Sequence, residues 1–227
     1  MLFMRIFTLG VLSLISSFAL QADTKPASSA EATSSIYTAK DYSYLLGMEG
    51  FSNELLKMHF TLYQGYVKNT NLIMSELASL NASGSTRSYD YGAIKRRFGW
   101  EYDGMKLHEY YFDNLGGKGD ASLAPNVVST LTKQFGSYEL WKTDFISTGM
   151  MRGIGWAILC KDNKNGRLFN VWINEHDLGH LAGATILLVM DVFEHAYMPQ
   201  YGLDRDKYIT AFFSNIDWSV VNQRSKP

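Results

Sequence analysis

Apolar side chains recur at helical spacing through the first half of this sequence. Within residues 50–80, successive members of one stripe are four, three, four, seven and four residues apart: Leu55, His59, Leu62, Tyr66, Ile73 and Leu77. This spacing is typical of an α-helix with one buried face, so residues 50–80 are predicted to form a long helix. Residues 81–88 contain glycine and serine and break the pattern, which predicts a turn.

Two more helical segments are predicted after this turn, at residues 89–99 and at about 103–115. In the second segment, four residues share one stripe: Gly104, His108, Tyr111 and Leu115. The glycine-rich residues 116–120 would end that helix.

The pattern changes after Pro125, where two short helices are predicted to precede three strand-like runs. These runs are 155–160, 167–173 and 184–191. Residues 161–166 carry a turn signal between the first two runs, which predicts an antiparallel hairpin. Residues 205–218 are predicted to form a closing helix.

These elements predict an α+β fold. A helical N-terminal domain, built on a long helical hairpin, would precede a domain with helices and a small three-stranded antiparallel sheet. We place the first domain at residues 37–125 and the second at 126–224.

The N-terminal residues have the layout of a secretory signal peptide. A positively charged start is followed by an apolar stretch at residues 6–20 and then by small residues. We predict a signal peptide at 1–22, with cleavage after Ala22 or Ala19, and a flexible linker at 23–36. The protein would then be exported, to the periplasm or outside the cell, without stable membrane insertion. A retained anchor is the alternative, although the apolar stretch is short for a span.

Composition narrows the classes of function. The formal net charge is −1, which gives no indication of a nucleic-acid partner. Cys160 is the only cysteine, so an internal disulfide is excluded, and its position at the end of an apolar run predicts burial. Aromatic residues reach 14%, which predicts an aromatic interior or interface.

The five histidines carry the candidate chemistry. Singly, each is most often a hydrogen-bonded core residue. Together, His59 and His108 lie on the apolar stripes of two helices, while Asp191 and His195 stand four residues apart where the last strand ends. Three imidazoles and one carboxylate suit a first-row metal such as Fe or Mn better than Mg or Ca. Zn competes on ligand type alone.

Several segments resemble one known family. DVFEHAY (191–197) is similar to the DVWEHAY segment of iron/manganese superoxide dismutases, and LHEYYFDNL (107–115) and HFTLYQGYVKNTN (59–71) resemble their two histidine helices. The resemblance runs from about residue 40 to residue 224. It implies dismutation of superoxide to dioxygen and hydrogen peroxide by one Fe or Mn ion per subunit, cycling between +3 and +2, in a homodimer or a higher oligomer.

The resemblance also implies a role for individual residues. His59, His108, Asp191 and His195 would bind the ion, with a solvent molecule as fifth ligand. Tyr66 matches the family's gateway tyrosine near the substrate path.

Other matching positions surround this ligand set. Trp156 matches a tryptophan that flanks the metal. Glu194 matches a glutamate that reaches across a dimer interface to the partner subunit's metal-binding histidine, and Tyr197 matches a tyrosine at that interface.

The chain departs from the family at several positions near the metal. Phe112 and Phe193 stand where tryptophans are common. The family's gateway histidine has no counterpart, because Leu62 and Tyr63 occupy its place.

A further departure concerns the glutamine that usually donates a hydrogen bond to the metal-bound solvent. Gly104 stands at one of its two usual places, and the second place reads NEHD (174–177). His176 is therefore the candidate replacement donor, ahead of Glu175, which is an acceptor when ionised. His180 is left without a role.

The sequence is also compatible with two other functions. The chain could be an exported metal-binding homologue with an interaction role and little or no dismutase activity. A zinc hydrolase is less well supported, because the sequence has no HExxH motif. Arg205 and Lys68 are candidates for attracting the anionic substrate, or are solvated surface cations.

Overall fold

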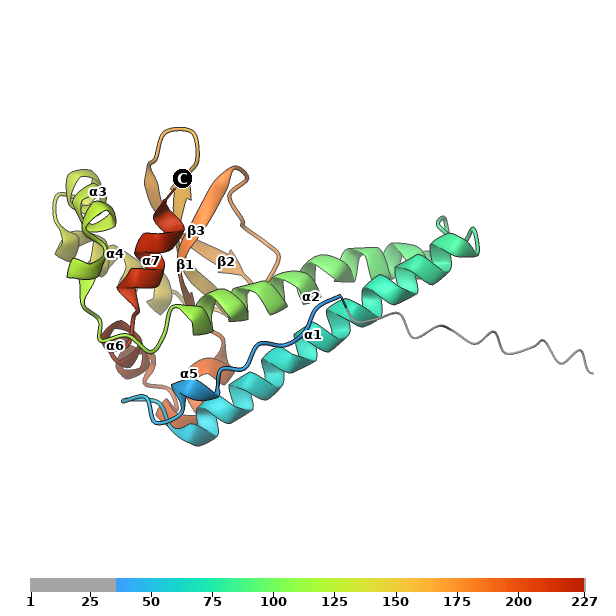
Figure 1. The fold of residues 1–227 in the computed structure, drawn as a ribbon, viewed down its shortest axis with the longest axis horizontal. Coiled ribbons are helices and arrows are strands. Elements are labelled where there is room, and N and C mark those ends of the chain that lie inside the picture. Colours follow the sequence, from blue (N-terminus) through green and yellow to red (C-terminus); the bar gives the residue numbers. More distant parts are fainter. Residues whose placement is uncertain (1–35, 227) are drawn as a thin grey trace, which may run out of the picture. The chain divides into compact units, whose positions relative to one another are not determined.

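A long antiparallel helical hairpin forms the first part of the computed structural model, which describes residues 36–226 (Figure 1). Its helices are α1 (Asn53–Ala82) and α2 (Tyr89–Asp113). Each begins at a serine whose side chain accepts a hydrogen bond from a backbone N–H three residues later, which satisfies one donor of the first turn. The predicted first helix and the turn after it are confirmed.

The second arm of the hairpin differs from the prediction, which divided it into helices at 89–99 and 103–115. Helix α2 runs without a break through Gly99 and Gly104. Glycine lowers helix propensity by about 1 kcal/mol relative to alanine, but packing against α1 outweighs that local preference. The buried residues of α2 lie in its second half, from Glu101 to Phe112. The first half follows α1 out to the tip of the hairpin (Figure 1).

The second part of the chain holds the remaining helices and the sheet (Figure 1). Short 3-10 turns lie at Ser43–Leu45 and Ala121–Leu123. The elements that follow are α3 (Pro125–Phe135), α4 (Tyr138–Met150), β1 (Gly155–Asp162), β2 (Leu168–Asn174), β3 (Ala184–Asp191), α5 (Glu194–Tyr201), α6 (Arg205–Ser214) and α7 (Trp218–Ser225). The predicted α+β class with a three-stranded antiparallel sheet is confirmed.

The closing helix was predicted as one element at 205–218, and this prediction is wrong. Helix α6 ends at Ser214, and the Asp217 side chain accepts a hydrogen bond from the Ser219 N–H to start α7. Local capping by an aspartate therefore divides a stretch whose apolar pattern reads as continuous.

Strand β1 lies in the middle of the sheet, in the order β2-β1-β3. Both of its neighbours run antiparallel to it, and Trp156 of β1 pairs with Asp191 of β3. Residues 156–159 are fully buried. The register therefore places Trp156 next to the last residue of β3, at the end of the sheet that faces the hairpin.

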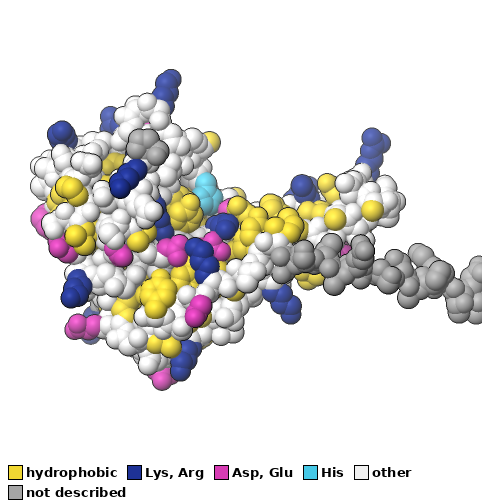
Figure 2. Space-filling view, viewed as in Figure 1, with side chains coloured by type: hydrophobic (Ala, Val, Ile, Leu, Met, Phe, Trp, Pro, Cys, Tyr) yellow, Lys and Arg dark blue, Asp and Glu magenta, His cyan; other side chains and the backbone are white. Residues whose placement is uncertain are grey.

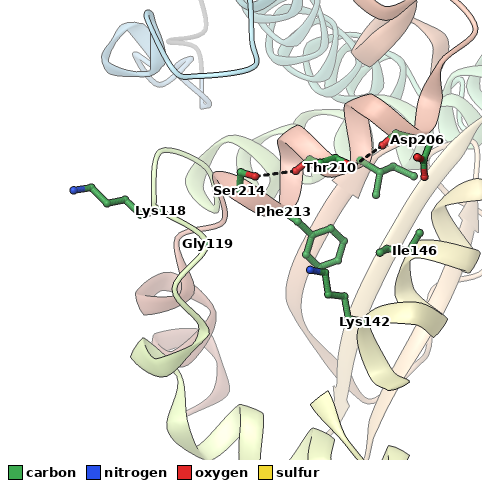
Figure 3. A pocket seen from close by; sticks show the side chains of 9 residues that line it. Lys118, Gly119, Lys142, Ile146, Asp206, Thr210, Phe213 and Ser214 are labelled. Carbon is green, nitrogen blue, oxygen red and sulfur yellow. Dashed lines mark hydrogen bonds between the residues drawn. The ribbon is translucent and has the colours of Figure 1, made fainter. Parts of the chain in front are cut away.

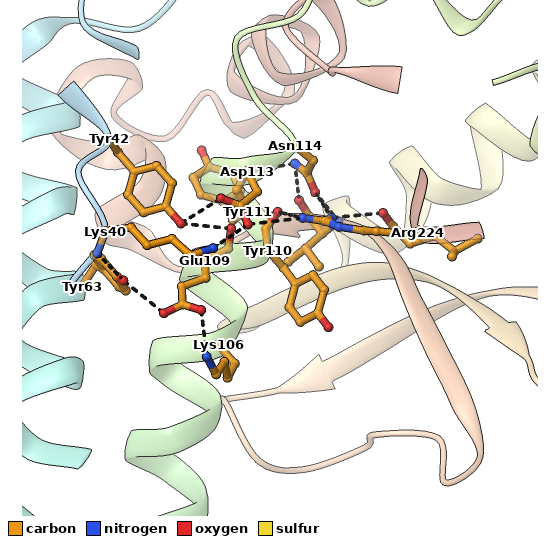
Figure 4. Close-up of polar contacts among 12 residues, drawn as sticks. Lys40, Tyr42, Tyr63, Lys106, Glu109, Tyr110, Tyr111, Asp113, Asn114 and Arg224 are labelled. Atoms are coloured by element: carbon orange, nitrogen blue, oxygen red, sulfur yellow. Dashed lines mark hydrogen bonds and ion pairs between the residues drawn. The ribbon is translucent and has the colours of Figure 1, made fainter. Parts of the chain in front are cut away.

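Asn114 fastens the end of α2 to β3. Its amide nitrogen donates to the Val189 carbonyl (3.2 Å), and its carbonyl oxygen accepts from the Val189 N–H (2.9 Å). Arg224 of α7 adds a hydrogen bond to the same side chain (Figure 4). This junction fixes the second half of α2 relative to the strand that ends at Asp191.

Other sequence predictions have mixed outcomes. Cys160 is a free, buried thiol, and burial raises its pKa to about 12, in agreement with a structural role. The predicted signal peptide (1–22) and nearly all of the linker (23–36) lie outside the described residues. The boundary between domains 37–125 and 126–224 stays a prediction. Among residues 36–226, none of the helices combines the length and the apolar character needed to cross a membrane.

Candidate metal centre

Four side chains from four elements converge at the base of the hairpin. His59 comes from α1, His108 from α2, Asp191 from the end of β3 and His195 from α5, and one ligand atom from each lies within 4.8 Å of the others. Asp191 Oδ2 lies 3.2 Å from His59 Nε2, 3.1 Å from His195 Nε2 and 3.7 Å from His108 Nε2. The structure therefore brings together all four residues that were predicted to bind the metal.

The backbone around Asp191 explains why its carboxylate is fixed. Its Oδ1 accepts the Phe193 N–H (2.8 Å), while its carbonyl accepts the Tyr208 hydroxyl (2.6 Å). Oδ2 is left to face the three imidazoles. Burial alone would raise the pKa of Asp191, but the neighbouring His195 and His59 outweigh it and hold the pKa well below its usual range.

His108 has the protonation that a metal ligand needs. Its Nδ1 lies 2.6 Å from the Gly104 carbonyl, which can only accept, so Nδ1 carries the proton. Its Nε2 therefore has a free lone pair, and among the described residues this buried atom has no hydrogen-bond partner. Burial lowers the pKa of both His108 and His59, which favours neutral imidazoles.

These observations fit one bound ion. Ligand atoms about 2.1 Å from a common metal lie about 3–4 Å apart, and the three distances to Asp191 Oδ2 fall in that range. A buried nitrogen without a partner is costly unless it binds something. The mixed nitrogen and oxygen donors suit Fe or Mn.

Aromatic rings enclose the four side chains. Phe112 packs edge-on against His59 (4.9 Å between ring centroids), and Trp156 packs edge-on against His108 (5.0 Å). Phe193 stacks on His195 at 5.2 Å. The three residues predicted to surround the metal therefore each contact one of the candidate ligands, and Phe112 and Trp156 are fully buried. Histidine is nearly absent from the surface seen in Figure 2.

His176 lies beside this ring of aromatics and contacts Tyr66. The Trp156 indole N–H donates to His176 Nδ1 (3.1 Å), and His176 Nε2 lies 2.7 Å from the Tyr66 hydroxyl. Because an indole nitrogen can only donate, Nδ1 accepts and the proton of the neutral ring is on Nε2. His176 therefore donates to the Tyr66 oxygen. Burial lowers the pKa of His176 to about 4, so the ring is neutral near pH 7.

Tyr66 keeps its own proton available in this arrangement. Its ring stacks on His108 at 5.1 Å, and its oxygen accepts from His176, so its O–H is free to donate elsewhere. Burial, with smaller effects from Asp191 and Glu101, raises the pKa of Tyr66. The hydroxyl is therefore protonated at neutral pH.

Gly104 provides the room that Tyr66 needs. A Cβ atom at position 104 would lie 2.6 Å from Tyr66 Cδ1, which is closer than two non-bonded carbon atoms approach in proteins. The Tyr66 ring thus occupies the space that a side chain at position 104 would need, and the Tyr66 hydroxyl contacts His176.

Other predicted residues lie farther from the four ligands. Tyr63, at the place of the gateway histidine, points its hydroxyl to Glu109 Oε1 (3.1 Å) in a polar cluster outside the metal centre (Figure 4). Glu194 is exposed on the first turn of α5, while Tyr197 is buried. Lys68 is exposed.

Arg205 makes several hydrogen bonds that the amino-acid sequence did not predict. Its guanidinium donates to the carbonyls of Gly149, Met151 and Gly153 and to the Tyr197 hydroxyl. These bonds hold the chain between α4 and β1. The Arg205 guanidinium is therefore used in structural hydrogen bonds, which does not support its predicted role in attracting the anionic substrate. Trp100 was also missed: its ring packs edge-on against His176 at 4.7 Å.

Comparison with known proteins agrees with this geometry. A family model described as iron/manganese superoxide dismutases, C-terminal domain, matches residues 124–224. A superoxide dismutase [Fe] of Aquifex pyrophilus is 38% identical over 192 residues, which cover 82% of this chain and 89% of that protein. The chain belongs to the iron/manganese superoxide dismutase family. The resemblance found in the sequence is thereby confirmed.

Relatives in the iron/manganese superoxide dismutase family carry names with either metal. A superoxide dismutase [Fe] of Cupriavidus metallidurans is 35% identical over 78% of this chain and 89% of its own length. A superoxide dismutase [Mn] 2 of Haloferax volcanii is 34% identical over 70% of this chain and 79% of its own length. The cofactor is thus stated as Fe or Mn.

One surface groove of this superoxide dismutase family member has side chains that, in contrast to those of the buried centre, are unlike those of a metal site. This groove lies between α4 and α6, where Lys142 Nζ sits 5.1 Å from the Phe213 ring centre (Figure 3). Two lysines and one aspartate line it, and none of its described lining residues is a histidine. The His59, His108, Asp191 and His195 set is therefore the centre on which a function can be based.

Proposed function

We propose that this protein is a superoxide dismutase, which converts two superoxide anions and two protons into dioxygen and hydrogen peroxide. The observation that supports it best is the buried His108 Nε2, which faces Asp191, His59 and His195 without a hydrogen-bond partner among the described residues. An Fe or Mn ion held by these four residues supplies one-electron chemistry between its +3 and +2 states.

The chain's own residues handle protons and access. The proton of His176 is on Nε2, and this N–H donates a hydrogen bond to the Tyr66 oxygen. The hydrogen bond orients the tyrosine. The Tyr66 O–H then provides a proton donor next to His108, where the product peroxide needs one. Phe112, Phe193 and Trp156 limit access of bulk water, which strengthens each polar interaction within the centre.

We extend the proposal to an exported homodimer. Glu194 is exposed, and the side chain of the neighbouring ligand His195 is 23% exposed, although the other ligands are buried. A partner subunit could reach the centre from this side, and the resemblance assigns Glu194 to such a contact. The layout of residues 1–22 supports export to the periplasm or out of the cell. Mass spectrometry of the protein from the producing cells would contradict cleavage of the signal peptide if residues 1–22 were still present, and recovery of the protein only from the cytoplasmic fraction would contradict export.

The proposed activity is tested by metal analysis together with a superoxide decay assay. Asp191→Asn removes the charge that three imidazoles surround, so we expect the metal content to fall at least about tenfold and the decay rate to fall with it. Lys164→Ala, which changes an exposed turn residue, is the control and should match the wild type.

Two results would separate the alternatives. Full activity in Asp191→Asn would refute the proposed metal mechanism. A wild-type protein that binds Fe or Mn stoichiometrically without accelerating superoxide decay would instead support a metal-binding homologue with an interaction role.

A further inference from the structure

The segment between β2 and β3, residues 175–183, carries His176 and also His180. It begins with Glu175 at φ 55°, a backbone conformation that side-chain-bearing residues rarely adopt. Such a conformation persists where surrounding contacts fix it. The contacts that hold this segment therefore determine where the His176 ring lies.

One contact joins the segment to itself. The His180 ring nitrogen Nε2 lies 2.8 Å from the His176 backbone carbonyl. A carbonyl can only accept, so His180 Nε2 carries a proton and donates it. The Asn174 N–H also donates to the Leu178 carbonyl (2.8 Å), which closes a turn that contains His176 and ends two residues before His180.

A second contact joins the segment to the hairpin. His180 Nε2 lies 3.7 Å from Asp103 Oδ2 on α2, one residue before Gly104. The side chains of His180 and Asp103 are only 33% and 29% exposed, so their attraction is partly shielded from water. Asp177, the residue after His176, comes within 3.6 Å of the position that a Cβ at Gly99 would take. The segment is thus packed along the same turns of α2 that carry Trp100 and Gly104.

The His176 ring has little freedom once the segment is fixed. It lies 4.7 Å from the Trp100 ring on one side and 4.7 Å from Phe193, with which it stacks, on another. Its two nitrogens contact Trp156 and Tyr66. A shift of the backbone by 1 Å would lengthen the 2.7 Å contact to Tyr66 beyond ordinary hydrogen-bond length.

We propose that His180 is a positioning residue: its hydrogen bond to the His176 carbonyl, supported by Asp103, holds the segment 175–183 so that His176 meets Tyr66. This inference deepens the proposed function, on which its catalytic part rests. The His180 side chain contacts the His176 carbonyl and Asp103, so it acts on His176 through the backbone.

The test compares His180→Leu with His180→Gln. Leucine keeps bulk without a donor, while the glutamine amide can donate to the same carbonyl. In the metal-free protein, we expect amide hydrogen exchange of residues 175–183 to accelerate at least about tenfold in His180→Leu and to stay near the wild-type rate in His180→Gln. Leu181→Ala, which changes an exposed side chain of the same segment, is the matched control.

The metal-loaded variants provide the functional measurement. We expect His180→Leu to retain full metal content, to show a changed absorption spectrum of the bound ion, and to lose about tenfold in superoxide decay rate, with His180→Gln restoring both. Asp103→Asn should give an intermediate exchange rate.

Three results would each contradict a different claim about His180 or the enzyme. Wild-type exchange in His180→Leu would overturn the proposed hydrogen bond as a restraint. Accelerated exchange with an unchanged spectrum and decay rate would overturn its effect on the metal centre. A wild-type enzyme without activity would refute the proposed function, whereas the exchange rates and the spectrum would still decide the positioning role.

Discussion

At the scale of single residues, the neighbours of His176 determine which of its nitrogens carries the proton. The Trp156 N–H occupies Nδ1, so only Nε2 can donate, and the donor faces Tyr66. A charged His176 would have to give up the bond from Trp156, because both of its nitrogens would then be donors. The low pKa, which burial causes, agrees with this requirement.

The low pKa of His176 predicts how acid affects stability. The pKa is about 4 in the folded protein and about 6.5 in the unfolded chain, so the unfolded chain binds more protons as the pH falls from 6.5 to 4. Stability is therefore lost over that window and levels off below it. In metal-free protein, His176→Gln should escape this loss, which amounts to about 3 kcal/mol.

The measurement is the free energy of unfolding in urea at several pH values, for both proteins. Subtracting the two curves removes the contribution of the other histidines. The difference should be constant above pH 7 and should move in favour of His176→Gln between pH 6.5 and 4. Parallel curves across that range would show that His176 is not held neutral.

The sequence predicted individual site residues correctly where helical periodicity or a short spacing indicates them. His59 and His108 lie on apolar helical stripes, and the spacing of Asp191 and His195 brings both to one point, so these four could be found without a structure. Trp100 could not be found in this way. Its contact with His176 depends on a loop 76 residues later folding back over α2, and local periodicity contains no such information.

At the scale of the elements, the close approach of α1 and α2 at Gly104 is a specific requirement. We predict that Gly104→Ala forces the Tyr66 ring away from His108, because the new Cβ would lie 2.6 Å from Tyr66 Cδ1. Overpacking of this kind destabilises by about 1–3 kcal/mol, and the gain in helix propensity offsets about 1 kcal/mol of that. The superoxide decay rate should fall about tenfold with the loss of the Tyr66 contact to His176.

Gly92→Ala provides the comparison within the same helix. The nearest atom to a Cβ at Gly92 is Arg96 Nη1 at 3.7 Å, so alanine fits there and should stabilise the protein by up to about 1 kcal/mol. Urea unfolding and the decay assay measure both variants. If Gly104→Ala behaved like Gly92→Ala, the close packing of Tyr66 against position 104 would not matter.

The boundaries of elements were less predictable than their existence. Strand β3 was predicted at its observed bounds, since an apolar run ends there at a buried aspartate. Helix α2 was predicted as two pieces, because glycine content weakens the local signal while the packing that overrides it comes from α1. The separation of α6 from α7 depends on the cap at Asp217, which a continuous apolar pattern conceals.

At the scale of the whole molecule, the exposed side of His195 predicts that the protein works as a homodimer. Wild-type protein should sediment as two subunits, and Glu194→Ala should shift the equilibrium toward monomer. Glu139→Ala is the matched control, because Glu139 is likewise an exposed glutamate in the first turn of a helix. A monomeric wild type across micromolar concentrations would refute the dimer and the contact assigned to Glu194.

The four ligands also impose a condition on the order of events when the protein is made. His59 and Asp191 are 132 positions apart in the chain, although their side chains meet at 3.2 Å. Bringing such distant segments together is slow relative to forming either helix of the hairpin. A nascent chain that has reached only α2 can offer an ion two imidazoles and no carboxylate from this set. The selective site therefore exists only after nearly the entire polypeptide is complete, and an ion bound there acts as a cross-link between its two halves.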